Sequence, residues 1–151
     1  MRTIVAALLT ATVVAGRAAP AVSAEYMEKN QQMMARSYSP GVVTDGGRIV
    51  WLAGQTGFRD EQGKEVVGFE AQARQAFKNI DAVLKKAGGS LANMVTMTVF
   101  ITDPRLGDRF VELRAGFFPD GNFPASALIT ISHLARPGML IEIQGVGVIG
   151  G

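Results

Sequence analysis

The hydrophobic and polar positions along this chain change their spacing several times, and each change predicts a different element. Apolar stretches at residues 42–44 and 49–53 flank the Asp-Gly-Gly sequence of residues 45–47. Glycine adopts positive φ without strain, so this sequence is typical of a tight turn, and we expect an antiparallel hairpin here. The preceding residues 25–37 are polar and contain methionines, and we interpret them as a loose lead-in.

Two later segments carry apolar residues at the 3.6-residue spacing of an amphipathic helix. The first runs from Phe69 to Ala87, and the glycine pair at residues 88–89 ends it. The second follows Asp103-Pro104, a typical pair for the N-cap and the first helical position, and its apolar stripe runs from Leu106 to Phe117.

Three more segments have strand character: residues 93–101, which alternate between apolar and polar, and residues 125–134 and 140–148. The order of elements is therefore β-β-α-β-α-β-β. We expect an α+β domain with a single mixed β-sheet and two helices packed on one face.

Alternation also sorts the strand residues into two faces. The residues expected beneath the helices include Met97, Val99, Ala127, Ile129, Ile141 and Ile143. The residues expected on the opposite face include Thr96, Thr98, Ser126, Thr130, Glu142 and Gln144. Such a polar face either meets water, as in many antiparallel sheets, or lines a cleft between subunits, and both alternatives stay open.

The first 24 residues have the layout of a secretory signal peptide. A basic residue at position 2 precedes an apolar run over residues 4–15, and small residues at 22–24 form an A-x-A-like cleavage site. We expect this segment to be removed and the protein to be periplasmic or secreted; an uncleaved anchor or a start codon placed too far upstream are the alternatives. The chain then divides into a signal peptide (1–24), the lead-in (25–37) and one domain (38–151).

Composition excludes several classes of function. The signal carries two of the fifteen Lys and Arg residues, so its removal leaves thirteen against thirteen Asp and Glu. A neutral domain lacks the positive charge with which nucleic-acid-binding proteins neutralise phosphates. With no cysteine and one histidine, the chain offers no disulfide, no thiol nucleophile and no zinc-type cluster. We expect no metal and no cofactor, and we interpret His133, on the apolar side of its strand, as structural.

Glu142 is the candidate for acid–base chemistry. It lies between Ile141 and Ile143 in the last expected strand. Partial burial there would suit a carboxyl group that relays protons to and from a water molecule. The alternative is an ordinary solvent-facing glutamate on a strand.

Four stretches together resemble the RidA (YjgF) family over about residues 38–148: YSPGVVTDGGRIVWLAGQTG, EAQARQAFKNIDAVLKKAGGSLANMVTMTVFITD, FPASALITISHL and MLIEIQGVGV. Specific matches include Gly54-Gln55, Pro124-Ala125 and Ile141-Glu142-Ile143, in this order. The resemblance implies a chorismate-mutase-like subunit assembled as a homotrimer, with the polar sheet face lining clefts between neighbouring subunits.

The resemblance also implies a chemistry. The best-known members of the family hydrolyse reactive enamine and imine intermediates to keto acids and ammonia. In them, a glutamate that matches Glu142 positions or activates the attacking water. A tyrosine that matches Tyr38 and a backbone contact near Gly54 help to form the pocket.

The chain departs from the family at Ser126. Deaminating members read Pro-Ala-Arg here, and the arginine binds the substrate carboxylate through two donors, whereas serine offers one neutral hydroxyl. The cysteine common two positions later is Leu128, and an asparagine of the second helix is replaced by Glu112. Arg114 or Arg136 would replace the arginine only if the fold brings one of them into the cleft.

Two functions remain open. The first is a RidA-like hydrolase that uses Glu142 on a small neutral or cationic metabolite rather than the usual 2-imino acid, with Tyr38, Gly54 and Ser126 binding the substrate. The second is a non-catalytic trimer that binds a small molecule or a protein. The ribonuclease activity sometimes attached to the family fits poorly, because the charge is balanced and His133 is badly placed. Expected partners are a small molecule and further copies of the chain, with no nucleic acid and, after signal removal, no membrane.

Overall fold

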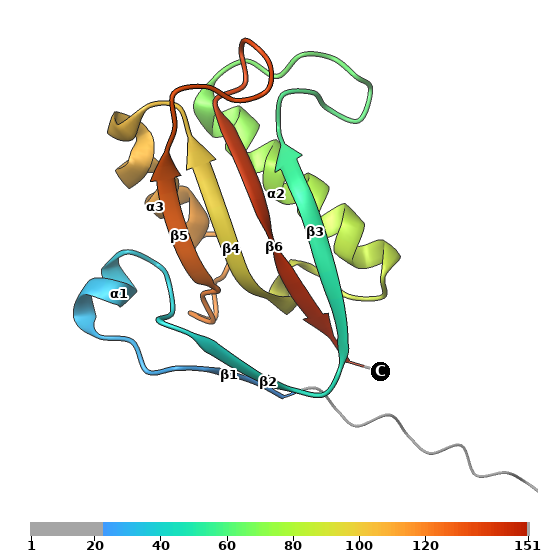
Figure 1. Ribbon diagram of the computed structural model, residues 1–151, viewed down its shortest axis with the longest axis vertical. Coiled ribbons are helices and arrows are strands. Elements are labelled where there is room, and N and C mark those ends of the chain that lie inside the picture. Colours follow the sequence, from blue (N-terminus) through green and yellow to red (C-terminus); the bar gives the residue numbers. More distant parts are fainter. Residues whose placement is uncertain (1–22, 151) are drawn as a thin grey trace, which may run out of the picture.

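The computed structural model describes residues 23–150, so most of the predicted signal peptide lies outside the described residues. The strands are β1 (Ser23–Tyr26), β2 (Val42–Asp45), β3 (Arg48–Thr56), β4 (Met94–Ile101), β5 (Ala125–Thr130) and β6 (Ile141–Ile149) (Figure 1). The helices are α1 (Gln31–Ala35), α2 (Phe69–Lys86) and α3 (Gly107–Ala115), with short 3-10 turns at Leu91–Asn93 and Pro104–Leu106. No described helix is long and apolar enough to cross a membrane.

The main sheet has four strands in the order β3-β6-β4-β5. The β4–β5 pair is parallel and the other two pairs are antiparallel, so the sheet is mixed. Helices α2 and α3 lie behind the sheet in Figure 1, and its front face is not covered by a helix. The expected α+β class, with two helices on one face of a mixed sheet, is therefore confirmed; we call the other side of the sheet the open face.

The expected hairpin over residues 42–53 is wrong. β2 pairs with β1 in a separate antiparallel sheet, with Tyr26 opposite Val42, whereas β3 pairs with β6. The turn glycines Gly46 and Gly47 do adopt positive φ, of 73° and 86°. The turn redirects the chain from one sheet to the other, because β1 and β6 supply the hydrogen-bond partners that hairpin pairing would have used.

Residues 25–37 are also more regular than a loose lead-in. They hold the end of β1 and the short helix α1, where the Asn30 N-cap accepts a hydrogen bond from Met33 N at 2.8 Å. No residue of α1 is buried, so its cap rather than core packing defines it.

The core lies between α2, α3 and the helix-facing side of the sheet. The apolar stripe of α2 is confirmed, since its fully buried residues are Ala73, Ala76, Phe77, Ile80 and Leu84. The Phe77 ring stacks on Phe117 at a centroid distance of 4.3 Å and on Phe110 at 6.1 Å, which joins the two helical segments. Gly88, at φ 89°, then ends the helix as the sequence indicates.

The two faces of β5 are the reverse of the expected assignment. In the parallel register Ser126 lies beside Met97 and Leu128 beside Val99, and both β4 residues are buried under the helices. Ala127 and Ile129 therefore lie on the open face and are exposed. Alternation shows which residues share a face, but the small contrast between Ala or Ile and Ser or Thr did not show which face the helices cover.

Candidate functional site

Glu142 lies on the open face in the middle of the sheet. Its strand partners are Thr56 on β3 and Phe100 on β4. Its neighbours Ile141 and Ile143 point the other way and are completely buried in the core. Glu142 itself is partly exposed, so the carboxylate is held by a rigid strand and remains within reach of a ligand.

Gly54 provides the space that the Glu142 carboxylate occupies. The register between β3 and β6 shifts between Leu52 and Gln55, and this bulge contains Gly54. A Cβ atom at Gly54 would overlap Glu142 Oε1, so a residue with a side chain would displace the carboxylate. The structure thus brings two of the expected site residues, Gly54 and Glu142, into direct contact.

A cavity of about 280 Å³ adjoins this pair. Its polar lining consists of Gly54, Gln55, Thr56, Arg59, Asn79 and Arg136, and Phe58 and Met139 complete it. The cavity therefore joins the end of β3 and α2 to the loop that precedes β6. Sequence reasoning missed Arg59 and Asn79, because only the fold brings them next to Gly54.

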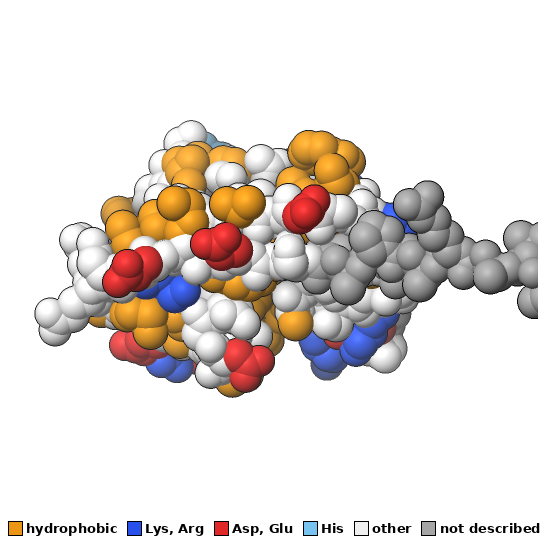
Figure 2. Space-filling view, turned by 90° about the horizontal axis from the view of Figure 1, so that it is seen from below, with side chains coloured by type: hydrophobic (Ala, Val, Ile, Leu, Met, Phe, Trp, Pro, Cys, Tyr) orange, Lys and Arg blue, Asp and Glu red, His pale blue; other side chains and the backbone are white. Residues whose placement is uncertain are grey.

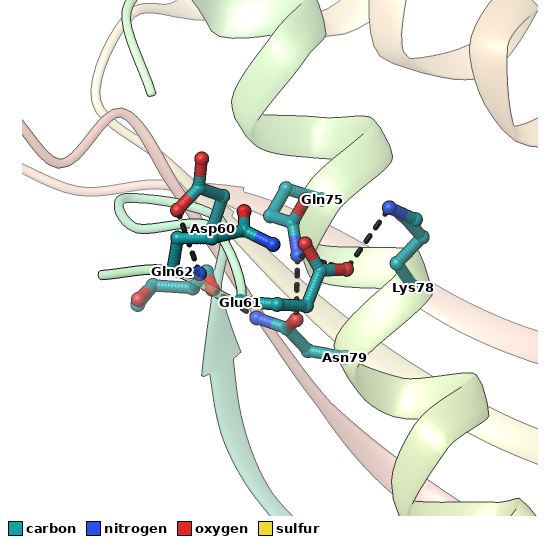
Figure 3. A network of polar contacts seen from close by, with 7 residues as sticks. Asp60, Glu61, Gln62, Gln75, Lys78 and Asn79 are labelled. Carbon is teal, nitrogen blue, oxygen red and sulfur yellow. Dashed lines mark hydrogen bonds and ion pairs between the residues drawn. The ribbon is translucent and has the colours of Figure 1, made fainter. Parts of the chain in front are cut away.

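Asn79 is held in place by a polar network on α2 (Figure 3). Its amide donates to Thr56 O at 2.9 Å and its oxygen accepts from Gln75 Nε2, also at 2.9 Å. Lys78 Nζ donates to Glu61 Oε1 at 2.9 Å, and this bond chiefly lowers the pKa of the Glu61 carboxyl to about 2. The network fixes the orientation of Asn79 at the cavity wall.

Tyr38 and Ser126 lie together at the opposite edge of the sheet. The residue after Tyr38, Ser39, forms a parallel bridge with Ala125, and its hydroxyl donates to Phe123 O at 2.5 Å. The segment that carries Tyr38 is thereby attached to the start of β5. Ser126 follows Ala125 and points to the helix side.

Arg114 of α3 occupies the space beneath Ser126. Its Nη1 donates to Ser126 Oγ at 2.6 Å and its Nη2 donates to the carbonyl of Arg36. The side chain is buried above the Phe110 ring, and its Nε has no partner among the described residues. Burial, with a smaller contribution from the positive charge of Arg36, lowers the pKa of Arg114 to about 10.

The four expected site residues therefore form two groups within one chain. Gly54 and Glu142 lie on β3 and β6, whereas Tyr38 and Ser126 lie at β5, on the other side of β4. Glu142 also faces away from the helices and Ser126 towards them. A single chain does not bring the four residues into one pocket.

His133 is not a structural residue in a strand. β5 ends at Thr130, and His133 is exposed in the loop that follows. With Ser132 and Arg136 it lines a second cavity, of about 320 Å³. In residues 23–150 no three His, Asp or Glu side chains lie close enough to bind a metal ion.

Comparison with known proteins identifies the family. The family model described as Endoribonuclease L-PSP matches residues 28–149. The RutC family protein of Aquifex aeolicus is 36% identical over 112 residues, which are 74% of this chain and 87% of that protein. The human 2-iminobutanoate/2-iminopropanoate deaminase is 35% identical over 114 residues, 75% of this chain and 80% of that protein.

A solved structure agrees with these relatives. RidA from a Psychrobacter species has a TM-score of 0.63 and 34% sequence identity, and the match covers 74% of this chain and 88% of that one. The matched residues 28–149 include β2 to β6 and both helices that cover the main sheet. The chain therefore belongs to the RidA (YjgF) family.

Proposed function

We propose that the protein is a hydrolase of small imine or enamine metabolites and that Glu142 holds the attacking water. The observation that carries this proposal is the contact between Glu142 and Gly54, which leaves a partly exposed carboxylate beside a cavity. A relative named for the deamination of 2-iminobutanoate and 2-iminopropanoate supports the same type of reaction.

The proposed reaction needs one water and no redox partner. The imine enters with its nitrogen protonated. Glu142 accepts a proton from the water as the water oxygen bonds to the carbon of this C=N group, and the product is a neutral carbinolamine. Glu142 returns the proton to the nitrogen, and ammonia leaves with the electron pair of the C–N bond. The electrons of the O–H bond form the C=O group as the hydroxyl proton passes back to Glu142. Protonated imine and water thus become a carbonyl compound and ammonium, once the ammonia takes up the proton held by Glu142.

We further propose that the site is completed between subunits of a homotrimer. Gly54 and Glu142 of one subunit would face Tyr38 and Ser126 of its neighbour, because one chain holds them apart. The open face supports assembly, since Trp51 on β3 is 78% exposed and Ile129 on β5 is 41% exposed. Figure 2 looks at the molecule from the end with β1 and β2, and hydrophobic side chains gather along its upper edge, the side of the open face.

The location of the reaction is also part of the proposal. The leader-like pattern of residues 1–24 supports a periplasmic or secreted protein that acts after export. Ammonia release from the same protein in periplasmic and cytoplasmic fractions would test this placement.

A non-catalytic trimer that binds a small molecule is the second candidate. One observation favours it: the residue at position 126 is a serine, and its hydroxyl already accepts a hydrogen bond from Arg114. A protein built in this way could hold a ligand through the cavity at Gly54 without turning it over.

Ammonia release from enzymatically generated 2-iminobutanoate separates the two candidates. The hydrolase should lose turnover in Glu142→Gln, because an amide cannot accept the proton, and should keep it in Glu28→Gln, an exposed glutamate between β1 and α1. Binding of 2-oxobutanoate without any turnover of the imine by the wild type would instead favour the binding protein.

A further inference from the structure

The end of β3 determines where Gly54 lies. After the bulge that contains Gly54, only Gln55 and Thr56 continue the pairing with β6, opposite Ile143 and Glu142. β3 is an outer strand of the main sheet, so within that sheet β6 holds this short segment from one side. A rotation of the segment would move Gly54 away from the Glu142 carboxylate that lies against it, so its place depends on a further attachment.

Asn79 on α2 supplies that attachment. Its Nδ2 donates to Thr56 O at 2.9 Å. The next residue, Gly57, packs so closely on the same helix that a Cβ atom there would lie 1.8 Å from Gln72 O. A packing contact limits how near two segments come, whereas a hydrogen bond also restricts the direction in which a carbonyl points. The bond from Asn79 therefore fixes the rotation of the strand end.

The amide of Asn79 is itself held in one orientation (Figure 3). Its oxygen accepts from Gln75 Nε2 at 2.9 Å, one helical turn earlier, which leaves the NH2 group to donate to Thr56. Gln75 is buried, and its Nε2 also lies 3.4 Å from Glu61 Oε1. A chain of hydrogen bonds thus leads from the loop before α2, through two side chains, to the strand residue opposite Glu142.

The other wall of the cavity is fixed independently of Asn79. Gln72 Nε2 donates to Gly138 O at 2.8 Å, and Gln72 Oε1 accepts from Leu140 N at 2.9 Å. These bonds attach the loop that carries Arg136 to α2. Replacement of Asn79 should consequently disturb the strand end and leave the loop before β6 in place.

Asn79 also lines the cavity, so a direct contact with the substrate is the alternative role. One donor and one acceptor of its amide are already used by Thr56 and Gln75, which favours a role in positioning. The two roles differ in their kinetics: a substrate contact made throughout the reaction acts on KM, whereas the placement of a catalytic group acts on kcat.

We propose that Asn79 is a positioning residue. Through Thr56 it fixes the end of β3, and so it keeps Gly54 where the Glu142 carboxylate is held and directed at the attacking water. The kinetic part of this inference rests on the proposed hydrolase. The placement of Gly54 against Glu142 is a property of the fold, and it can be measured without turnover.

Asn93 provides a matched control, because it makes the same type of connection at the other end of the sheet. Its Nδ2 donates to Val148 O at 3.2 Å and its oxygen accepts from Ser90 N at 2.8 Å. Val148 pairs with Ile49, at the opposite end of β3 from the bulge. Asn79→Ala and Asn93→Ala therefore each remove one bond to a strand carbonyl and one further hydrogen bond.

The kinetic test measures ammonia release from enzymatically generated 2-iminobutanoate by the full-length protein and both variants. We expect Asn79→Ala to lower kcat about tenfold or more, because a small displacement of a catalytic group is costly, and to change KM less than about twofold. Asn93→Ala should keep kcat even where its melting temperature falls as far. An unchanged kcat in Asn79→Ala, a rise in KM alone, or an equal loss of kcat in both variants would overturn the inference.

Amide NMR spectra of the same proteins test the placement without turnover. Asn79→Ala should shift the signals of Gly54 and Glu142, and Asn93→Ala should leave these two signals in place. Gln75→Leu keeps Asn79 but removes the partner that orients it, so it should shift the same signals and replaces Asn79→Ala if that variant does not fold. With these shifts and a wild type that releases no ammonia, the positioning would stand and the hydrolase would be rejected; unchanged signals would reject the positioning itself.

Discussion

The guanidinium of Arg114 is hydrogen-bonded to Ser126 Oγ at 2.6 Å inside the protein, where helix α3 meets the edge strand β5. An arginine on a helix thus lies directly beneath Ser126, the strand position at which the family resemblance implies an arginine. The positive charge is buried and serves the packing of α3, β5 and the chain after α1. This relationship governs what substitutions at either residue can do.

Replacing Arg114 by alanine should lower the free energy of unfolding by about 2–4 kcal/mol, because it leaves a cavity and removes two hydrogen bonds. Arg114→Met fills most of the volume and removes a charge whose desolvation is costly, so it should destabilise by less. Urea denaturation of both variants measures the difference. Equal losses for Ala and Met would show that the hydrogen bonds, and not the filled volume, dominate.

Ser126→Arg, the substitution that restores the family's arginine, should destabilise the fold. Its guanidinium would meet that of Arg114 in a site with little water, where like charges repel strongly. Adding Arg114→Met to Ser126→Arg should recover part of the melting temperature and make the new arginine usable for carboxylate binding. Thermal melts of the single and double variants measure the coupling between residues 114 and 126. Strictly additive changes in melting temperature would contradict the expected repulsion between the two arginines.

Gly54→Ala should abolish imine hydrolysis with only a small change in melting temperature. The new Cβ would force the Glu142 carboxylate out of its place, whereas Gly54 itself is exposed and outside the core. Gly116→Ala is the matched control, because a Cβ there meets its nearest neighbour at an ordinary 3.5 Å and should leave turnover intact. Full activity in Gly54→Ala would mean that the position of Glu142 is not critical.

The chain has one tryptophan, and it reports on assembly directly. Burial of Trp51 between subunits should give blue-shifted fluorescence that moves to the red as the protein is diluted and the trimer dissociates. Trp51→Glu should yield a monomer by light scattering, since a charge would replace the most exposed aromatic side chain on the open face.

Val67→Glu provides the control for this change. Val67 is as exposed as Trp51, at 80%, but lies in the loop before α2 rather than on the sheet. The variant should remain a trimer. Loss of assembly in both variants would show that general solubility, and not the open face, controls the oligomeric state.

The ion pair between Glu61 and Lys78 predicts a pH dependence. The pKa of Glu61 is lowered to about 2 in the folded protein from a usual 4.5, so its stabilisation is present above about pH 4.5 and is lost as the pH falls towards 2. The difference in melting temperature between wild type and Glu61→Gln should therefore shrink over this range. Because the pair is exposed, salt should reduce the difference at pH 7 as well; a difference that is independent of pH would exclude the pair as its source.

The sequence was sufficient for the elements that are governed by periodicity. The stripe from Phe69 to Ala87, the glycine stop at Gly88 and the alternation along β4 each depend on local spacing, and the structure confirms them. The contact between Gly54 and Glu142 was accessible only through the resemblance, because 88 positions separate a bulge from the residue that fills it.

Features that depend on pairing between distant parts of the chain could not be predicted from the sequence. The pattern at residues 42–53 indicates two strands and a turn, but it does not show that β2 pairs with β1 rather than with β3. The faces of β5 were reversed because an edge strand with Ala, Ile, Ser and Thr carries little contrast in hydrophobicity. The place of Arg136 depends on the loop that Gln72 fixes, and no local pattern encodes a hydrogen bond across 66 positions.

If the leader is cleaved as its pattern predicts, the pairing of β1 with β2 would change at the new amino terminus. Cleavage after Ala24, as the leader pattern predicts, would remove Ser23 and Ala24 and with them the pairs to Asp45 and Thr44, leaving Glu25 opposite Val43 and Tyr26 opposite Val42. Two of the four residue pairs between β1 and β2 would then exist only in the precursor. The mature protein would carry a free strand end beside the turn into β3, so removal of the leader would also change the surface that this end of the protein offers.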